Sequence, residues 1–212
     1  MKIEKNYPGL TQEEHGVYVL NGDLVSKEGI EIDLNNPLIV IGSVTAEYGI
    51  SVKCGILVKQ SITAGGGIAA GWDIRAERSI KARDGISAGG EIVAGEDINA
   101  GFGIESGSHI IAGGSITATD GVRAIGDVRA CQNIDVLCGI DAGGSITAKC
   151  GIRAGWGITA GEGIQAGTYI DCRKRIFAGT AICYDDDYCD KTIKCSELRN
   201  GTIAYGELII TK

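Results

Sequence analysis

The residues best suited to acid–base chemistry are two histidines, His15 and His109, because imidazole titrates near neutral pH. His109 lies midway along the chain between Glu91 and Asp127. Two carboxylates could hold an imidazole as a general base. A solvated row of opposite charges explains the same pattern, and we favour that interpretation. Zinc binding by three histidines, as in one class of carbonic anhydrase, is excluded by the count.

Three cysteines spaced six residues apart, Cys183, Cys189 and Cys195, form the candidate metal site. Thiolates and carboxylates bind zinc, and four aspartates lie among these cysteines. The Cys-x-x-Cys spacing common in zinc sites is absent, however, and a six-residue spacing also results from the repeat described below. We therefore expect no bound metal and no other cofactor.

Glycine runs such as Gly65–Gly67 superficially suggest phosphate-binding loops. A phosphate loop follows a strand, opens a helix and carries a Gly-Lys-Ser or Gly-Lys-Thr sequence. No long strand followed by a helix surrounds these runs, and no Gly-Lys-Ser or Gly-Lys-Thr sequence follows them. We expect the glycines to serve chain corners, where they let the backbone bend without strain. No catalytic residue, and no enzyme activity, is predicted.

A six-residue repeat organises most of the chain and must position all of these residues. From residue 62 to residue 182, each of 21 positions spaced six apart is Ile, except Val122 and Val128. The second residue after it is Ala in 17 of the 21 cases, and Gly usually follows. Ile and Ala two residues apart point to one face of a strand, because side chains alternate across a strand. Each hexad therefore predicts one short strand and one corner.

The residue before each aliphatic indicates that three hexads make one turn. It is Gly at seven positions spaced 18 apart: Gly49, Gly67, Gly85, Gly103, Gly121, Gly139 and Gly157. At six further positions spaced 18 apart it is Ser, Asp or Asn. A turn of two hexads would mix these classes, whereas a turn of three separates them into rows. We expect the Ser, Asp and Asn row to hydrogen-bond corner amides.

The predicted fold is all-β: a single-stranded, triangular parallel β-helix with 18 residues per coil and about eight to nine coils. Residues 1–31 lack the phase and are predicted to form an N-terminal cap, residues 32–183 the β-helix, and residues 184–212 an irregular capping segment, all in one domain. Uncovered ends of a β-helix expose unpaired backbone groups and must be capped or used for assembly.

Cys172 and Cys195 replace Ala as small core residues. Free thiols are favoured over a disulfide between Cys172 and Cys189.

Composition and charge exclude several classes. The chain has 34 glycines but only 2 prolines, which excludes collagen, and its many aliphatics exclude a disordered chain. No long uncharged apolar segment is present, so we expect no membrane span. A net charge of −7 argues against a nucleic-acid partner. The first residues lack the apolar stretch of a secretory signal, so reduced thiols and a cytoplasmic location are expected.

Aromatic residues are few, at 5% of the chain. Phe102 and Trp156 share one predicted edge, three turns apart, with Asp120 and Cys138 between them; Trp72 lies at another corner. This arrangement is too sparse to predict a sugar-stacking stripe.

Segments such as Gly-Glu-Ile-Val-Ala-Gly (90–95) and Gly-Asp-Val-Arg-Ala (126–130) resemble bactofilins, the polymer-forming bacterial cytoskeletal proteins. That family forms triangular right-handed β-helices that polymerise end to end, so the resemblance, over residues 32–182, implies right-handed winding and self-association. Hexapeptide acyltransferases are similar in period, but their small residue precedes the aliphatic, whereas here it follows, as in 85–90. Those enzymes also use a catalytic histidine and loops that leave the coil.

We therefore expect a non-catalytic structural or scaffold protein, a rigid rod whose partner is a second copy, end to end or lateral, or another protein. The alternative is a β-helix that binds a glycan or a protein, as in phage- or surface-associated modules. A degenerate hexapeptide-repeat transferase is the third hypothesis.

Overall fold

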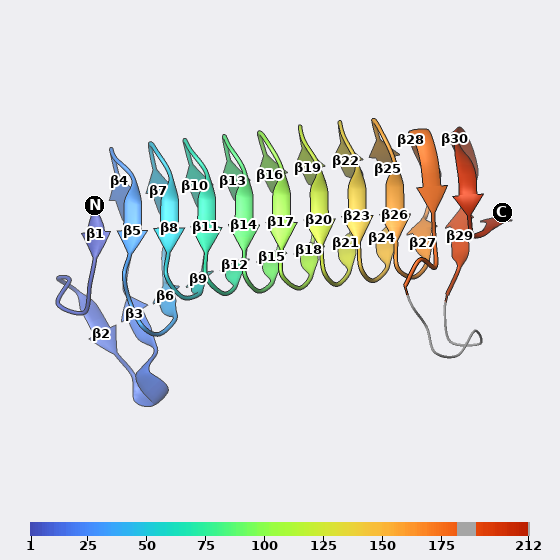
Figure 1. Ribbon diagram of the computed structural model, residues 1–212. Helices are drawn as coiled ribbons and strands as arrows, with labels where there is room; N and C mark the ends of the chain where they lie inside the picture. Colours follow the sequence, from blue (N-terminus) through green and yellow to red (C-terminus); the bar gives the residue numbers. More distant parts are fainter. Residues whose placement is uncertain (182–189, 212) are drawn as a thin grey trace.

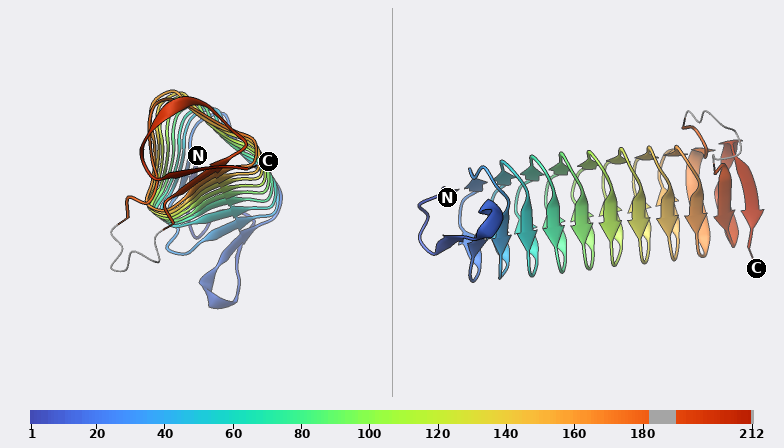
Figure 2. Two further views of the ribbon diagram at one scale, coloured as in Figure 1. Left: turned by 90° about the vertical axis from the view of Figure 1, so that its right-hand side faces the viewer. Right: turned by 90° about the horizontal axis from the view of Figure 1, so that it is seen from below.

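The chain folds as a parallel β-helix of about ten turns of 18 residues (Figure 1). The computed structural model describes residues 1–181 and 190–211. Within these residues one short 3-10 turn, Glu14–Gly16, is the only helical element. Figure 2 shows a triangular cross-section and a straight rod. The all-β, three-sided fold predicted from the repeat is confirmed.

Three stacks of short strands form the three sides of the rod. The first side contains β4 (Leu24–Ser26), β7 (Val44–Ala46), β10 (Ile62–Ala64), β13 (Ile80–Ala82), β16 (Ile98–Ala100), β19 (Ile116–Ala118), β22 (Ile134–Val136) and β25 (Ile152–Ala154). The second side contains β1 (Lys2–Ile3), β5 (Ile30–Ile32), β8 (Ile50–Val52), β11 (Ile68–Ala70), β14 (Ile86–Ala88), β17 (Ile104–Ser106), β20 (Val122–Ala124), β23 (Ile140–Ala142) and β26 (Ile158–Ala160).

The third side contains β2 (Leu10–Gln12), β3 (Tyr18–Leu20), β6 (Leu38–Val40), β9 (Ile56–Val58), β12 (Ile74–Ala76), β15 (Ile92–Ala94), β18 (Ile110–Ala112), β21 (Val128–Ala130), β24 (Ile146–Ala148), β27 (Ile164–Ala166), β29 (Thr192–Cys195) and β31 (Glu207–Ile210). Two longer strands, β28 (Tyr169–Phe177) and β30 (Glu197–Tyr205), continue from the first side to the second. Throughout the regular part, each strand pairs in parallel with the equivalent strand of the next coil, for example Ile62 with Ile80.

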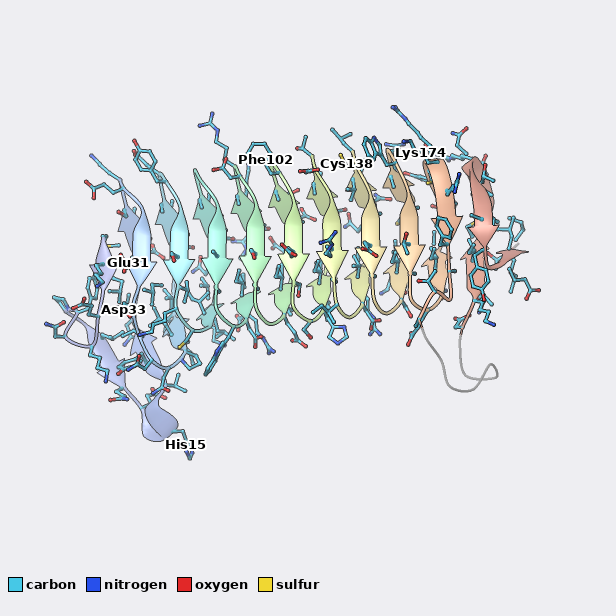
Figure 3. All side chains as sticks on the ribbon, in the orientation of Figure 1. His15, Glu31, Asp33, Phe102, Cys138 and Lys174 are labelled. Atoms are coloured by element: carbon cyan, nitrogen blue, oxygen red, sulfur yellow. The ribbon has the colours of Figure 1, made fainter. Side chains whose placement is uncertain are left out.

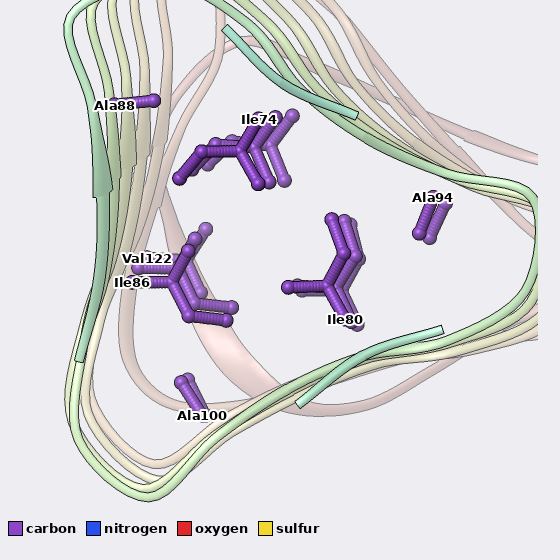
Figure 4. Close-up of a cluster of buried hydrophobic side chains, with 14 of the residues drawn as sticks. Ile74, Ile80, Ile86, Ala88, Ala94, Ala100 and Val122 are labelled. Carbon is purple, nitrogen blue, oxygen red and sulfur yellow. The ribbon is translucent and has the colours of Figure 1, made fainter. Parts of the chain in front are cut away.

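The core consists of stacked aliphatic columns. The first and third residues of each regular strand point inward and are buried, and the residue between them faces outward. Figure 4 shows this arrangement for Ile74, Ile80 and Ile86. Seen from the N-terminal end, the chain runs clockwise as it recedes, from Ile86 through Ala94 to Ala100, so the winding is right-handed. Among the described residues, Ser106 is the one buried polar side chain, and its hydroxyl lies 2.7 Å from the carbonyl oxygen of Gly90.

Glycines at the first position of a corner serve close stacking of the coils and not an unusual backbone conformation, which corrects the expectation from the sequence. Between residues 23 and 178 no glycine has a positive φ. A Cβ placed on Gly65 would overlap the carbonyl oxygen of Glu47 in the preceding coil, and one on Gly101 would overlap that of Arg83. Where glycine holds the first position of a corner, its missing Cβ lets the neighbouring coils approach to hydrogen-bonding distance, whereas residues such as Glu47 and Arg83 hold that position at other corners.

The N-terminal residues contribute strands to the stack although they lack the hexad phase. Strands β3, β4 and β5 pair with β6, β7 and β8, which accounts for the turns beyond the eight to nine expected. β1 lies on the outer edge of β5, and β2 lies antiparallel on β3. The N-terminal turn is therefore covered on two of its three sides, while β4 has no outer neighbour among the described strands.

Candidate functional site

His109 acts as an amide acceptor at a corner. Its Nδ1 accepts a hydrogen bond of 2.8 Å from the backbone N–H of Asp127, and Gly126 leaves room for the ring. Of the two carboxylates that flank it, Glu91 pairs with Arg75 at 2.8 Å and Asp127 pairs with Arg129 at 2.6 Å. The imidazole ring is therefore tied to the backbone; both carboxylates pair with arginines, and Oδ2 of Asp127 also lies 3.6 Å from Nδ1 of His109.

The hydrogen bond made by His109 belongs to a general pattern at corners. In the regular part of the rod, an Asp or Asn that directly precedes a strand accepts a hydrogen bond through its side chain. The donor is the backbone N–H of the equivalent residue, 18 positions later, in the next coil. Examples are Asp73 with Glu91 (2.9 Å), Asp97 with Ser115 (2.7 Å) and Asn133 with Gly151 (2.9 Å). The expected bonding of corner amides by this row is confirmed for Asp97 and Asn133 and, at 3.4 Å, for Ser115, whereas the Ser79 hydroxyl donates to Glu96. His109 serves as an acceptor in the same way.

The candidate metal site is described at only one of its three cysteines. Cys183 and Cys189 lie outside the described residues, whereas Cys195 is fully buried on β29 and faces the core. Burial raises the pKa of the Cys195 thiol. Among residues 1–181 and 190–211, no group of three or more His, Cys, Asp or Glu side chains is placed to hold a metal ion.

The other described cysteines are free thiols. Cys172 is fully buried, burial raises its pKa, and its Sγ lies 2.8 Å from the carbonyl oxygen of Trp156. The prediction that Cys172 and Cys195 replace alanine in the core is confirmed. Cys138 lies at an exposed edge, where a hydrogen bond to Asp120 raises the pKa of the thiol.

The C-terminal turn leaves inward-facing aliphatic residues uncovered. Ile193 and Cys195 on β29 are fully buried, yet their register partners on β31, Leu208 and Ile210, are 37% and 53% exposed. β30 pairs with β28 and β31 pairs with β29, and no described strand covers their outer edges. The end of the core is therefore open to solvent in the part of the chain that the structure describes (Figure 2).

A groove with a volume of about 1050 Å³ runs along the second side, from Gly49 to Thr159. Its floor contains the seven glycines that precede the strands of this side: Gly49, Gly67, Gly85, Gly103, Gly121, Gly139 and Gly157. One wall contains the outward residues of the second side, such as Glu105, Arg123 and Asp141, and the other contains Asp120 and Trp156.

Exposed aromatic side chains follow the edge beside this groove. Tyr48, Phe102 and Trp156 all occupy the middle position of the corner between the first and second sides, and each is more than half exposed. They recur at every third turn of the coil. The shared edge of Phe102 and Trp156 was predicted from the sequence, whereas Tyr48 was not, although it precedes Phe102 by the same interval. Figure 3 shows this edge at Phe102, Cys138 and Lys174, and the Lys174 ammonium lies 4.4 Å from the Trp156 ring centre.

No protein-family model, curated protein or solved structure matches this chain. The regular coils of 18 residues are compatible with a hexapeptide-type β-helix, and no family match supports the resemblance to bactofilins. No helix in the described part of the chain is long and apolar enough to span a membrane.

Proposed function

We propose that this chain is a non-catalytic structural rod that pairs with a second copy of itself through its C-terminal turn. The observation that carries the proposal is the exposure of Leu208 and Ile210, whose partners one coil earlier are fully buried. A second chain that packs on this exposed end of the core would bury the same side chains that the next coil buries elsewhere in the rod. The occupation of His109 by a backbone amide supports a non-catalytic role.

Burial of the open end provides the driving force. Covering a half-exposed Leu or Ile contributes on the order of 1 kcal/mol for each side chain. Tyr205 is 45% exposed and adds further apolar area at the same end. The outer edges of β30 and β31 also present backbone N–H and C=O groups that a second chain can pair with.

The unequal ends favour a closed pair of rods. β1 and β2 cover two sides of the N-terminal turn, whereas the described C-terminal turn is open on all three. A contact between two identical surfaces has two-fold symmetry and closes after two copies. If the two-fold axis runs perpendicular to the long axis of the rod, the outer edges of the two β31 strands meet in antiparallel orientation. In a pairing of β31 centred on Ile209, Leu208 of one copy then lies opposite Ile210 of the other.

Analytical ultracentrifugation of the full chain tests this proposal. The wild type should sediment as a dimer of twice the 22.0 kDa chain mass, and Ile210→Lys should weaken association at least tenfold because a charge would lie in the apolar contact. Ile125→Lys is the matched control, since Ile125 is 72% exposed at a corner in the middle of the rod. Circular dichroism melting should show both variants folded.

Three outcomes would contradict the proposal. The first is a wild-type chain that stays monomeric at high concentration. The second is equal loss of association in Ile125→Lys and Ile210→Lys. The third is growth into filaments of many rods, which would require the N-terminal end to associate as well.

A further inference from the structure

The glycines on the floor of the groove are not required by the fold. Their φ angles are not positive, and a Cβ on Gly85, Gly103 or Gly121 would meet its nearest atom at 3.1–3.5 Å. The same position on the other two corner rows holds residues such as Ser79 on one row and Asp73 on the other. Seven successive glycines therefore keep a channel open where side chains would fit.

These glycines also leave a row of backbone donors without acceptors. Where Asp, Asn or His holds this position on the other corners, its side chain accepts the N–H of the equivalent residue one coil later, as Asp97 does for Ser115, whereas the Ser79 hydroxyl donates to Glu96. Glycine has no side chain to do this. Among the hydrogen bonds of the described residues, none has the N–H of Gly67, Gly85, Gly103, Gly121, Gly139 or Gly157 as its donor. These glycines are partly exposed, and their N–H groups repeat once per coil, about 4.8 Å apart.

The spacing and charge of the groove select the class of ligand. An extended peptide presents carbonyl groups on one face every second residue, about 6.8 Å apart, which does not match donors about 4.8 Å apart. Glu105, Asp120 and Asp141 outnumber Arg123 along the groove, and Arg123 is paired with Asp141 at 3.8 Å. The excess of carboxylates disfavours polyanions.

We propose that the glycine groove binds an extended, uncharged, β-linked polysaccharide. A pyranose unit in such a chain has nearly the length of one coil, so one oxygen of each unit can accept a glycine N–H. Trp156, which lines the groove and is 58% exposed, offers a flat apolar surface for the face of a sugar ring. The carboxylates of Glu105 and Asp120 accept hydrogen bonds from hydroxyl groups. The groove ends at Thr159, before β30, so this site is independent of the proposed dimer contact.

Isothermal titration of the full chain with cellohexaose, xylohexaose and chitohexaose tests the proposal. At least one of these neutral hexasaccharides should bind. Gly103→Asp should lose affinity at least tenfold, because the new carboxylate occupies the channel and accepts the N–H of Gly121, as Asp97 does for Ser115. Trp156→Ala should also lose at least tenfold.

Ser79→Asp is the matched control. It places the same side chain at the equivalent position of another corner, outside the groove, and should leave affinity unchanged. Circular dichroism melting should show both aspartate variants folded at the titration temperature. Binding of none of the three glycans, unchanged affinity in Gly103→Asp, or binding of a decaproline peptide in place of the glycans would overturn the proposal. The Ile210→Lys variant should bind as the wild type does, which separates this site from dimerisation.

Discussion

Two glycines of one corner should respond in opposite ways to the same substitution. Gly101 and Gly103 flank Phe102, and both are partly exposed. A Cβ on Gly101 would overlap the carbonyl oxygen of Arg83, whereas a Cβ on Gly103 would meet the carbonyl oxygen of Gly121 at 3.1 Å. We therefore expect Gly101→Ala to push two coils apart and Gly103→Ala to be accommodated by a shift of a few tenths of an ångström.

The expected change in the free energy of unfolding follows from the hydrogen bonds at this corner. Separation of the coils weakens the hydrogen bonds from Gly101 N–H to Ala82 (3.1 Å) and from Phe102 N–H to Asp84 (3.2 Å). Each is worth about 1 kcal/mol, and overpacking of a close contact costs roughly a further 1–3 kcal/mol. Gly101→Ala should therefore lower the free energy of unfolding by about 3–5 kcal/mol. Gly103→Ala should change it by about 1 kcal/mol or less.

Urea denaturation followed by circular dichroism measures both values, with thermal melting as a second probe. Because stability in a solenoid is close to a sum over neighbouring coils, a local defect should also broaden the transition of Gly101→Ala. Equal destabilisation by the two alanines would refute the steric argument. So would a larger loss in Gly103→Ala, since that outcome would assign the structural requirement to the floor of the groove.

Two further predictions concern single side chains. His109→Ala should lower the free energy of unfolding by about 1 kcal/mol in urea denaturation, because the N–H of Asp127 loses its acceptor. His109→Asn should retain most of that stability, as Asn133 serves the same role; equal loss in both variants would count against the amide-acceptor role. Cys131 is exposed and should react with a thiol reagent under native conditions much faster than Cys172, whose pKa is raised by burial. Mass spectrometry after timed labelling of the folded chain measures this, and equal rates would contradict the buried position of Cys172.

The sequence predicted the core with little ambiguity because each strand encodes its own inward face. Ile and Ala two residues apart specify burial locally, and the row of Gly before Ile50, Ile68 and their successors revealed the turn of three hexads. Residues 18–32 were not recognised as strands of the stack, since Leu24 and Ile30 fall outside the six-residue phase while still pairing with β7 and β8.

The candidate site was less accessible to sequence reasoning. Tyr48 precedes Phe102 by the same interval that separates Phe102 from Trp156, so the aligned aromatic edge was readable from spacing alone. The groove was not, because all corner glycines look alike in the sequence. Their difference lies in how close the neighbouring coil comes: a Cβ on Gly101 would overlap a carbonyl oxygen, whereas a Cβ on Gly121 would meet one at 3.5 Å.

Periodicity alone thus specified which side chains enter the core, how many residues make a turn and that the rod has three sides, because strand alternation is a local property of the backbone. The tertiary structure decided which corners are closed, which amides lack acceptors and which end of the rod is open. Those features arise from contacts between residues of neighbouring coils, and their distances depend on how closely the stacked coils approach.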